Sequence, residues 1–198
     1  MSDQGLNAVT PLAGFSETVG STAISEPSGR SLVAVAPSRG EEAELQSALK
    51  AGFGLAWPVT GQSTTNGDAR LMGMAPDQAF LLFSHAGPNA VPAVREKLGN
   101  AGWLTDQSDS WAMLSVSGPD CRAALERLCM LDLHRDVFVI GAAQRTTMEH
   151  LAVIIVREEA DTFLLMSPTS SAESFLDAVV TSARNIVPSK SAGSGAAA

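Results

Sequence analysis

The chain has 198 residues, of which 45% are apolar and 17% are charged, so it can bury a substantial core but carries fewer charges than a free-standing soluble protein usually does. Its net charge of -8 at pH 7 argues against nucleic acid and against anionic membrane surfaces as partners. No apolar run is long enough to span a bilayer, and the first residues, MSDQGLNAV, lack the basic start and apolar centre of a signal peptide.

The two ends of the chain differ in composition from the region between them. Residues 1–30 are rich in Ser, Thr, Gly and Pro, which favours an extended arm. This arm is either a disordered terminus or a segment laid over a partner, and the low overall charge hints at such a partner. Residues 188–198 are small and polar, and we expect a disordered tail there.

Residues 31–106 are predicted to form a first α+β half. Apolar runs predict strands, and the periodic segment after the first of them predicts a helix that ends at a glycine. A polar stretch with an Asn-Gly pair predicts a loop before a β-hairpin. In chain order the predicted elements are a strand over 31–36, a helix over 41–52, a loop over 61–68, strands over 70–74 and 79–84, a helix over 89–98 and a strand from 102.

Residues 107–187 are predicted to form a second half with a similar order of strands and helices. Its first strand leads through a Gly-Pro turn into a helix, for which Pro119 is suited to the first helical position. Ser170 and Glu173 have capping-box spacing at the start of the last helix. The predicted elements are a strand over 111–116, a helix over 119–129, strands over 142–148, 151–156 and 162–166, and a helix over 172–184.

The element order predicts the fold class. Each half reads approximately β-α-β-β-α, with room for an extra strand. That order is typical of split βαβ units, in which helices cover one face of a mostly antiparallel sheet. The sequence therefore predicts an α+β protein made of two similar halves.

No catalytic motif is evident in the sequence. His85, His134 and His150 lie outside any metal-ligand spacing, and the Gly-rich nucleotide-binding motifs and the GxSxG motif are absent. Asp132 and His134 could place a carboxylate beside an imidazole base. The simpler interpretation, which we favour, is that Asp132 caps a turn while His134 lies on the surface.

The two cysteines are predicted to be free. Cys121 and Cys129 are eight residues apart on or beside one helix, which places them about 12 Å apart, too far for a disulfide. Cys121 is most simply a small core residue. This cysteine usage favours a reducing, cytoplasmic setting.

Several ordered blocks carry a family resemblance. The most specific is WAMLSVSGPDCRAALERLCMLDLHRDVF at 111–138, and the others are PLAGF (11–15), SLVAVAPSRGEEAELQSALKAGFGLAWP (31–58), ARLMGMAPDQAFLLF (69–83), AAQRTTMEHLAVIIVR (142–157) and TFLLMSPTSSAESFLDAV (162–179). In this order and spacing, they resemble the γ subunit family of heterotetrameric sarcosine oxidase. That family is similar in turn to the folate-binding aminomethyltransferase fold.

The resemblance implies a non-catalytic subunit of an oxidoreductase complex that oxidatively demethylates sarcosine to glycine. It implies α, β and δ subunits as partners, with FAD, FMN, NAD, tetrahydrofolate and zinc on those partners and no cofactor or metal on this chain. Residues at apolar or turn positions outside the obvious core are the candidates for the partner interface. They are Leu12, Phe15, Trp57, Trp103 and His134.

Two alternatives stay open. A stand-alone folate-binding or aminomethyl-transfer protein would bind tetrahydrofolate and lose binding when Arg145 or Asp106 is changed. Two differences from the aminomethyltransferases argue against this alternative. A short Met148-Glu149-His150 segment replaces their longer Gly-rich hairpin, and Ser167-Pro168-Thr169 replaces their Asn-Ala pair. The other alternative is the equivalent subunit of an N-methylglutamate dehydrogenase-type complex.

Overall fold

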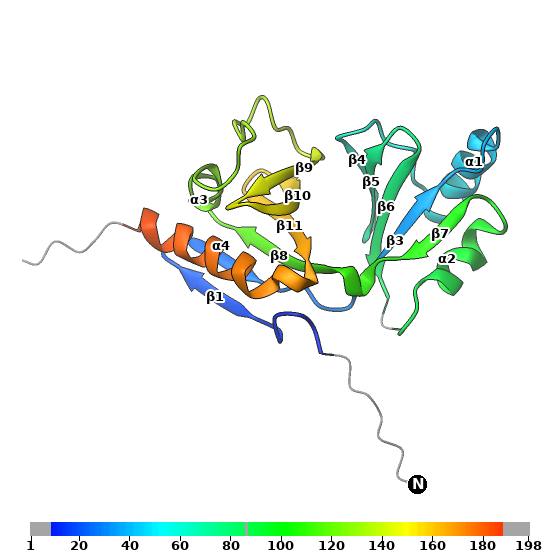
Figure 1. Ribbon diagram of the computed structural model, residues 1–198. Helices are drawn as coiled ribbons and strands as arrows, with labels where there is room; N and C mark the ends of the chain where they lie inside the picture. Colours follow the sequence, from blue (N-terminus) through cyan, green and yellow to red (C-terminus); the bar gives the residue numbers. More distant parts are fainter. Residues whose placement is uncertain (1–8, 86, 188–198) are drawn as a thin grey trace, which may run out of the picture.

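The computed structural model describes residues 9–85 and 87–187, and it arranges them in four layers (Figure 1). Two antiparallel sheets face each other, with two helices on the outer side of each. The predicted α+β class with antiparallel sheets is confirmed. The predicted tail at 188–198 and the first eight residues of the predicted arm lie outside the described residues.

The first half forms a five-stranded sheet with strand order β4-β5-β6-β3-β7. Helix α1 ends at Gly54 rather than at Gly52, because Gly54 takes the left-handed conformation (φ +68°) that closes the helix and donates its N–H to the last carbonyls. The expected polar loop contains strand β4, which pairs with β5. The elements are β3 (Arg30–Ala36), α1 (Glu42–Phe53), β4 (Ser63–Asn66), β5 (Ala69–Ala75), β6 (Gln78–Ser84), α2 (Val91–Leu98) and β7 (Trp103–Asp106).

The second half forms a six-stranded sheet with strand order β1-β2-β8-β11-β10-β9. Its last four strands repeat the order of β3, β6, β5 and β4 in the first sheet, so the two halves share one topology. The elements of this half are β8 (Trp111–Ser117), α3 (Cys121–Glu126), β9 (Ala143–Met148), β10 (Leu151–Glu159), β11 (Thr162–Pro168) and α4 (Ala172–Ile186).

Two strands of the six-stranded sheet come from the N-terminal region. Strands β1 (Ser16–Val19) and β2 (Thr22–Ser25) form a hairpin, and β2 pairs with β8. The prediction of an extended arm over residues 1–30 missed this hairpin. It folds onto the sheet because Ile24 is fully buried in the core of the second half, while the Glu26 carboxylate accepts the N–H groups of Leu12 and Gly14.

Both helix starts predicted for the second half differ in the structure. Helix α3 begins after Asp120, so Pro119 lies in the preceding turn rather than at the first helical position. Helix α4 follows a short 3-10 turn and begins after Ser171, without a side-chain cap. The capping box predicted for Ser170 and Glu173 is therefore wrong.

The core has three parts, one in each space between neighbouring layers. One cluster lies between the six-stranded sheet and helices α3 and α4, and a second lies between the five-stranded sheet and helices α1 and α2. The third joins the inner faces of the two sheets through Leu32, Phe80, Ile154, Leu164 and their neighbours. Both faces of each sheet are thus covered, so the central strands are apolar along their whole length.

Candidate partner interface

Residues 130–141 connect the end of helix α3 to strand β9 without regular secondary structure. Figure 1 shows this connection as the yellow-green loop that stands out beyond the sheets. It carries an unusual share of exposed apolar side chains: Met130 is 84% exposed, Val137 61%, Val139 43% and Ile140 58%. We call it the 130–141 segment.

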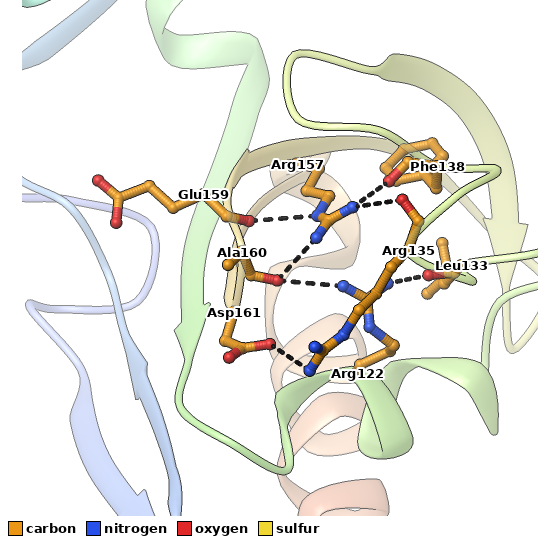
Figure 2. A network of polar contacts seen from close by, with 8 residues as sticks. All are labelled: Arg122, Leu133, Arg135, Phe138, Arg157, Glu159, Ala160 and Asp161. Atoms are coloured by element: carbon orange, nitrogen blue, oxygen red, sulfur yellow. Dashed lines mark hydrogen bonds and ion pairs between the residues drawn. The ribbon is translucent and has the colours of Figure 1, made fainter.

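Arg157 binds the backbone of the 130–141 segment (Figure 2). Its side chain, on strand β10, is only 5% exposed. Nη1 donates to the carbonyl oxygens of Arg135 (3.0 Å) and Phe138 (2.7 Å), while Nη2 donates to Ala160 O (3.1 Å) and Nε to Glu159 O (3.3 Å). Burial is the main cause that lowers the pKa of this guanidinium. The carbonyl oxygens around it supply the partial negative charge that a buried cation requires.

Arg122 and Arg135 extend this network, as Figure 2 shows. Arg122, on helix α3, donates to the carbonyl oxygens of Leu133 and Ala160, and its guanidinium lies 5.2 Å from the centre of the Phe163 ring. Arg135 forms an ion pair of 3.6 Å with Asp161. The segment is therefore tied through its backbone to α3 and β10, and through the Arg135 side chain to the β10–β11 turn.

One side chain of the run Val137-Phe138-Val139-Ile140 points into the core, and the other three lie at the surface. Phe138 is buried at 2% exposure and stacks against Phe163, with ring centres 6.4 Å apart. The other three side chains point outward. One aromatic anchor and the arginine network thus fix a short stretch whose remaining apolar side chains lie outside the core.

A second exposed apolar residue, Val59, belongs to a neighbouring turn. Gly61, two residues after Val59, accepts the N–H of Ala143, and Gly141, next to Ile140, accepts the N–H of Ser63 at 2.7 Å. These hydrogen bonds join the two halves at the edges formed by β4 and β9. Val59 is 76% exposed.

The five predicted interface residues lie in different environments. Leu12 belongs to the core cluster of the second half, so its side chain is covered by this chain itself. Phe15 and Trp57 are partly buried and pack against the cores of the second and first halves. Trp103, on β7, is 69% exposed, and His134, in the 130–141 segment, also lies at the surface. The structure does not gather these five side chains into one patch.

The Asp132–His134 pair forms a turn rather than a carboxylate–imidazole contact. Asp132 Oδ1 accepts the backbone N–H of His134 at 2.8 Å, and the imidazole Nδ1 instead lies 3.8 Å from a carboxylate oxygen of Asp136. The favoured interpretation, a turn cap beside a surface histidine, agrees with this geometry.

Arg145 and Asp106, on which the folate alternative depends, lie on different sheets. Arg145 is exposed on β9, an edge strand of the six-stranded sheet, and sits 5.7 Å above the Phe80 ring. Asp106 ends β7, the edge of the five-stranded sheet far from β4, and its carboxylate accepts the N–H groups of Ala90 and Ser108. These two residues do not form a common site.

Within residues 9–85 and 87–187, no three His, Cys, Asp or Glu side chains are grouped so that they could hold a metal ion. Over the same part of the chain, every helix is too short or too polar to cross a membrane.

Both cysteines are free and buried. Burial, together with the negative charge of Asp161, raises the pKa of Cys121 from 9.0 to about 11. The folded chain disfavours the thiolate, so this contribution to stability is complete below about pH 9 and declines as the pH rises toward 11.

We therefore expect urea midpoints to fall between pH 8.5 and 10.5, and to fall less in Cys121→Ala. Equal slopes in the two proteins would contradict this assignment. The chain has no tyrosine, so no phenol titrates in the same range.

A known protein family and solved structures are similar to this chain. The family model described as sarcosine oxidase, gamma subunit family matches residues 39–183. No curated protein was found to match the chain.

Two solved structures are similar to the chain. A heterotetrameric sarcosine oxidase from Corynebacterium sp. U-96, in complex with pyrrole 2-carboxylate, contains a chain with a TM-score of 0.78 and 17% identity; the match covers 92% of this chain and 98% of that one. Glycine cleavage system aminomethyltransferase T from Bartonella henselae gives a TM-score of 0.59 and 16% identity over 84% of this chain and 47% of that one. The chain thus spans about half of the transferase, and the predicted likeness to the transferase fold is confirmed.

Proposed function

The chain belongs to the sarcosine oxidase gamma subunit family, and we propose that it is the γ subunit of a heterotetrameric complex that oxidatively demethylates sarcosine to glycine. The observation that carries the proposal is the family match over residues 39–183. The fold shared with nearly the full length of a chain in a heterotetrameric sarcosine oxidase supports it.

In this proposal the chain is structural, and the chemistry belongs to its partners. The α, β and δ subunits would carry FAD, FMN, NAD, tetrahydrofolate and zinc. Arg122 and Arg157 support such a role, because their guanidinium groups bind backbone carbonyls of the same chain. The exposed apolar side chains of the 130–141 segment are a second support, since a subunit of a stable complex covers apolar surface at its interfaces.

Co-expression tests the proposal. The chain is affinity-tagged, expressed with its native neighbouring gene products and purified, and the eluate is assayed for flavin absorbance and for sarcosine-dependent formation of hydrogen peroxide. We expect larger and smaller subunits to co-elute with a yellow flavin spectrum and with activity toward sarcosine. A monodisperse, colourless chain that elutes alone and binds tetrahydrofolate in a titration would overturn the proposal. Activity toward N-methylglutamate in place of sarcosine would reassign the substrate.

A further inference from the structure

We infer that Met130 is a site of reversible oxidation, where hydrogen peroxide converts the thioether to the sulfoxide without disturbing the fold. Only peroxide in the surrounding solution is required, so the reaction does not depend on the proposed function. Three features of the chain lead to this site: the exposure of its methionines, the burial of its cysteines, and the surroundings of the Met130 sulfur.

Met130 differs from the other methionines in its exposure to solvent. It is 84% exposed, whereas Met74 is partly buried and packs against the cluster between the two sheets. The remaining methionines of residues 9–85 and 87–187 are at most 7% exposed; they are Met72, Met113, Met148 and Met166. Peroxide dissolved in water therefore reaches the sulfur of Met130 far more readily than these others.

The two cysteines do not compete with Met130 for peroxide. A cysteine reacts with peroxide as its thiolate, which requires a lowered pKa and access to solvent. Cys121 is fully buried and Cys129 is 9% exposed. Burial is the main cause that raises the pKa of both thiols, to about 11 for Cys121. Both thiols thus stay protonated and shielded at neutral pH, while a thioether needs no deprotonation to react.

The surroundings of Met130 can accommodate the product. Cys129 and Met148 form an antiparallel bridge, whose register places Met130 opposite Thr147 on the edge strand β9. The Thr147 hydroxyl donates to Met130 Sδ at 3.4 Å. A thioether is a weak acceptor, and the sulfoxide oxygen is a stronger one for the same donor. Because Met130 belongs to none of the three core clusters, the new polar group disrupts no buried packing.

The reaction is a two-electron transfer of one oxygen atom. A lone pair on Met130 Sδ attacks one oxygen of hydrogen peroxide, so that an S–O bond forms and the O–O bond breaks. The second oxygen leaves with the electron pair of that bond, takes the proton of the transferred oxygen and becomes water. The sulfur is oxidised to the sulfoxide and the peroxide is reduced.

Peptide mapping by mass spectrometry tests this site on the tagged, full-length chain, purified with whatever subunits co-elute. The protein is treated with hydrogen peroxide, the reaction is stopped with catalase, and the gain of one oxygen is followed with time at each methionine. We expect Met130 to be oxidised roughly tenfold faster, or more, than the five other described methionines. Equally fast oxidation of any of those five, or of either cysteine, overturns the inference.

Two variants and one change of condition serve as controls. Met130→Leu keeps an apolar side chain of similar size without the sulfur, and it should abolish the early oxygen uptake. Met74→Leu, the matched control at the partly buried methionine, should leave that uptake unchanged. In urea that unfolds the chain, the rates at all six methionines should converge. A preference for Met130 that persists in urea would assign its reactivity to local sequence, and the inference would fail.

Reversibility is measured on the folded chain after Met130 has been oxidised. Methionine sulfoxide reductases A and B, supplied with dithiothreitol, are expected to remove the added oxygen, because each acts on one sulfoxide epimer and the side chain is exposed. The urea midpoint of the oxidised chain should equal that of the untreated chain. A sulfoxide that both enzymes reduce only after unfolding, or a lowered midpoint, overturns the inference.

Discussion

Replacing Arg157 by alanine is expected to lower the free energy of unfolding by about 3 kcal/mol, which is a large share of the stability of a domain this size. Four backbone carbonyls lose a hydrogen bond, although Ala160 keeps the one from Arg122; two of the four, on Arg135 and Phe138, belong to the 130–141 segment. Urea unfolding measures the loss. Hydrogen exchange should locate it, with faster exchange concentrated in the 130–141 segment.

Two further variants give this prediction its controls. Arg39→Ala removes an exposed guanidinium, and we expect its unfolding free energy to stay within about 0.5 kcal/mol of wild type. Arg157→Lys keeps the charge but presents one ammonium instead of a planar fork, so it should retain only a minor part of the stabilisation. A lysine variant as stable as wild type would mean that charge alone, and not the directed hydrogen bonds, holds the segment.

Gly118→Ala is expected to destabilise the chain by about 3 kcal/mol or more. Gly118 follows strand β8 with a φ of +112°, where a side chain is strained. A Cβ there would also lie only 2.0 Å from the carbonyl oxygen of Ser21, in the turn between β1 and β2. Because backbone stands in the way, relief requires the N-terminal hairpin to move off the sheet. Thermal unfolding measures the loss, and proteolysis between residues 16 and 25 reports the displaced hairpin.

The matched control is Gly29→Ala. Gly29 also has a positive φ, +67°, but a Cβ there would meet no atom within 4 Å. This variant should lose only about 1 kcal/mol, the strain of the left-handed conformation. Equal losses in the two variants would show that backbone strain alone, and not the contact with Ser21, accounts for the effect at position 118.

Much of the fold could be predicted because its signals are local. The apolar runs at 31–36, 79–84, 151–156 and 162–166 identify the central strands by composition alone. They are continuous rather than alternating because each strand is covered by helices on one side and by the other sheet on the opposite side. That continuity was a signal for two stacked sheets, which the prediction of helices over one sheet face did not use.

The elements that were missed depend on partners far away in the sequence. Strand β4 is polar and only partly buried, and it exists because β5 pairs with it. Strands β1 and β2 are four residues each, in a composition typical of loops, and β2 finds its pairing partner in β8, about ninety residues later. Tertiary pairing overrides weak local preference in both places.

The five interface residues predicted from the sequence differ in burial, for a related reason. His134 falls within the 130–141 segment and Trp103 is exposed, whereas Leu12 belongs to the core. Exposure of an apolar side chain cannot be read from its type. One usable signal was present: Arg157 ends the otherwise apolar run LAVIIV, and a cation placed there needs a polar structure around it. The structure that it organises is the 130–141 segment.

The N-terminal hairpin also has a consequence for biosynthesis. The strand that receives residues 16–25, Trp111–Ser117, is synthesised about ninety residues after them. Strands β3 to β7 can meanwhile close their own sheet, since all their pairing partners lie between residues 30 and 106. The first half is thus expected to fold during translation, while the hairpin waits unpaired until β8 emerges. The hairpin is therefore expected to be among the last described parts to reach its place, although it is made before both sheets.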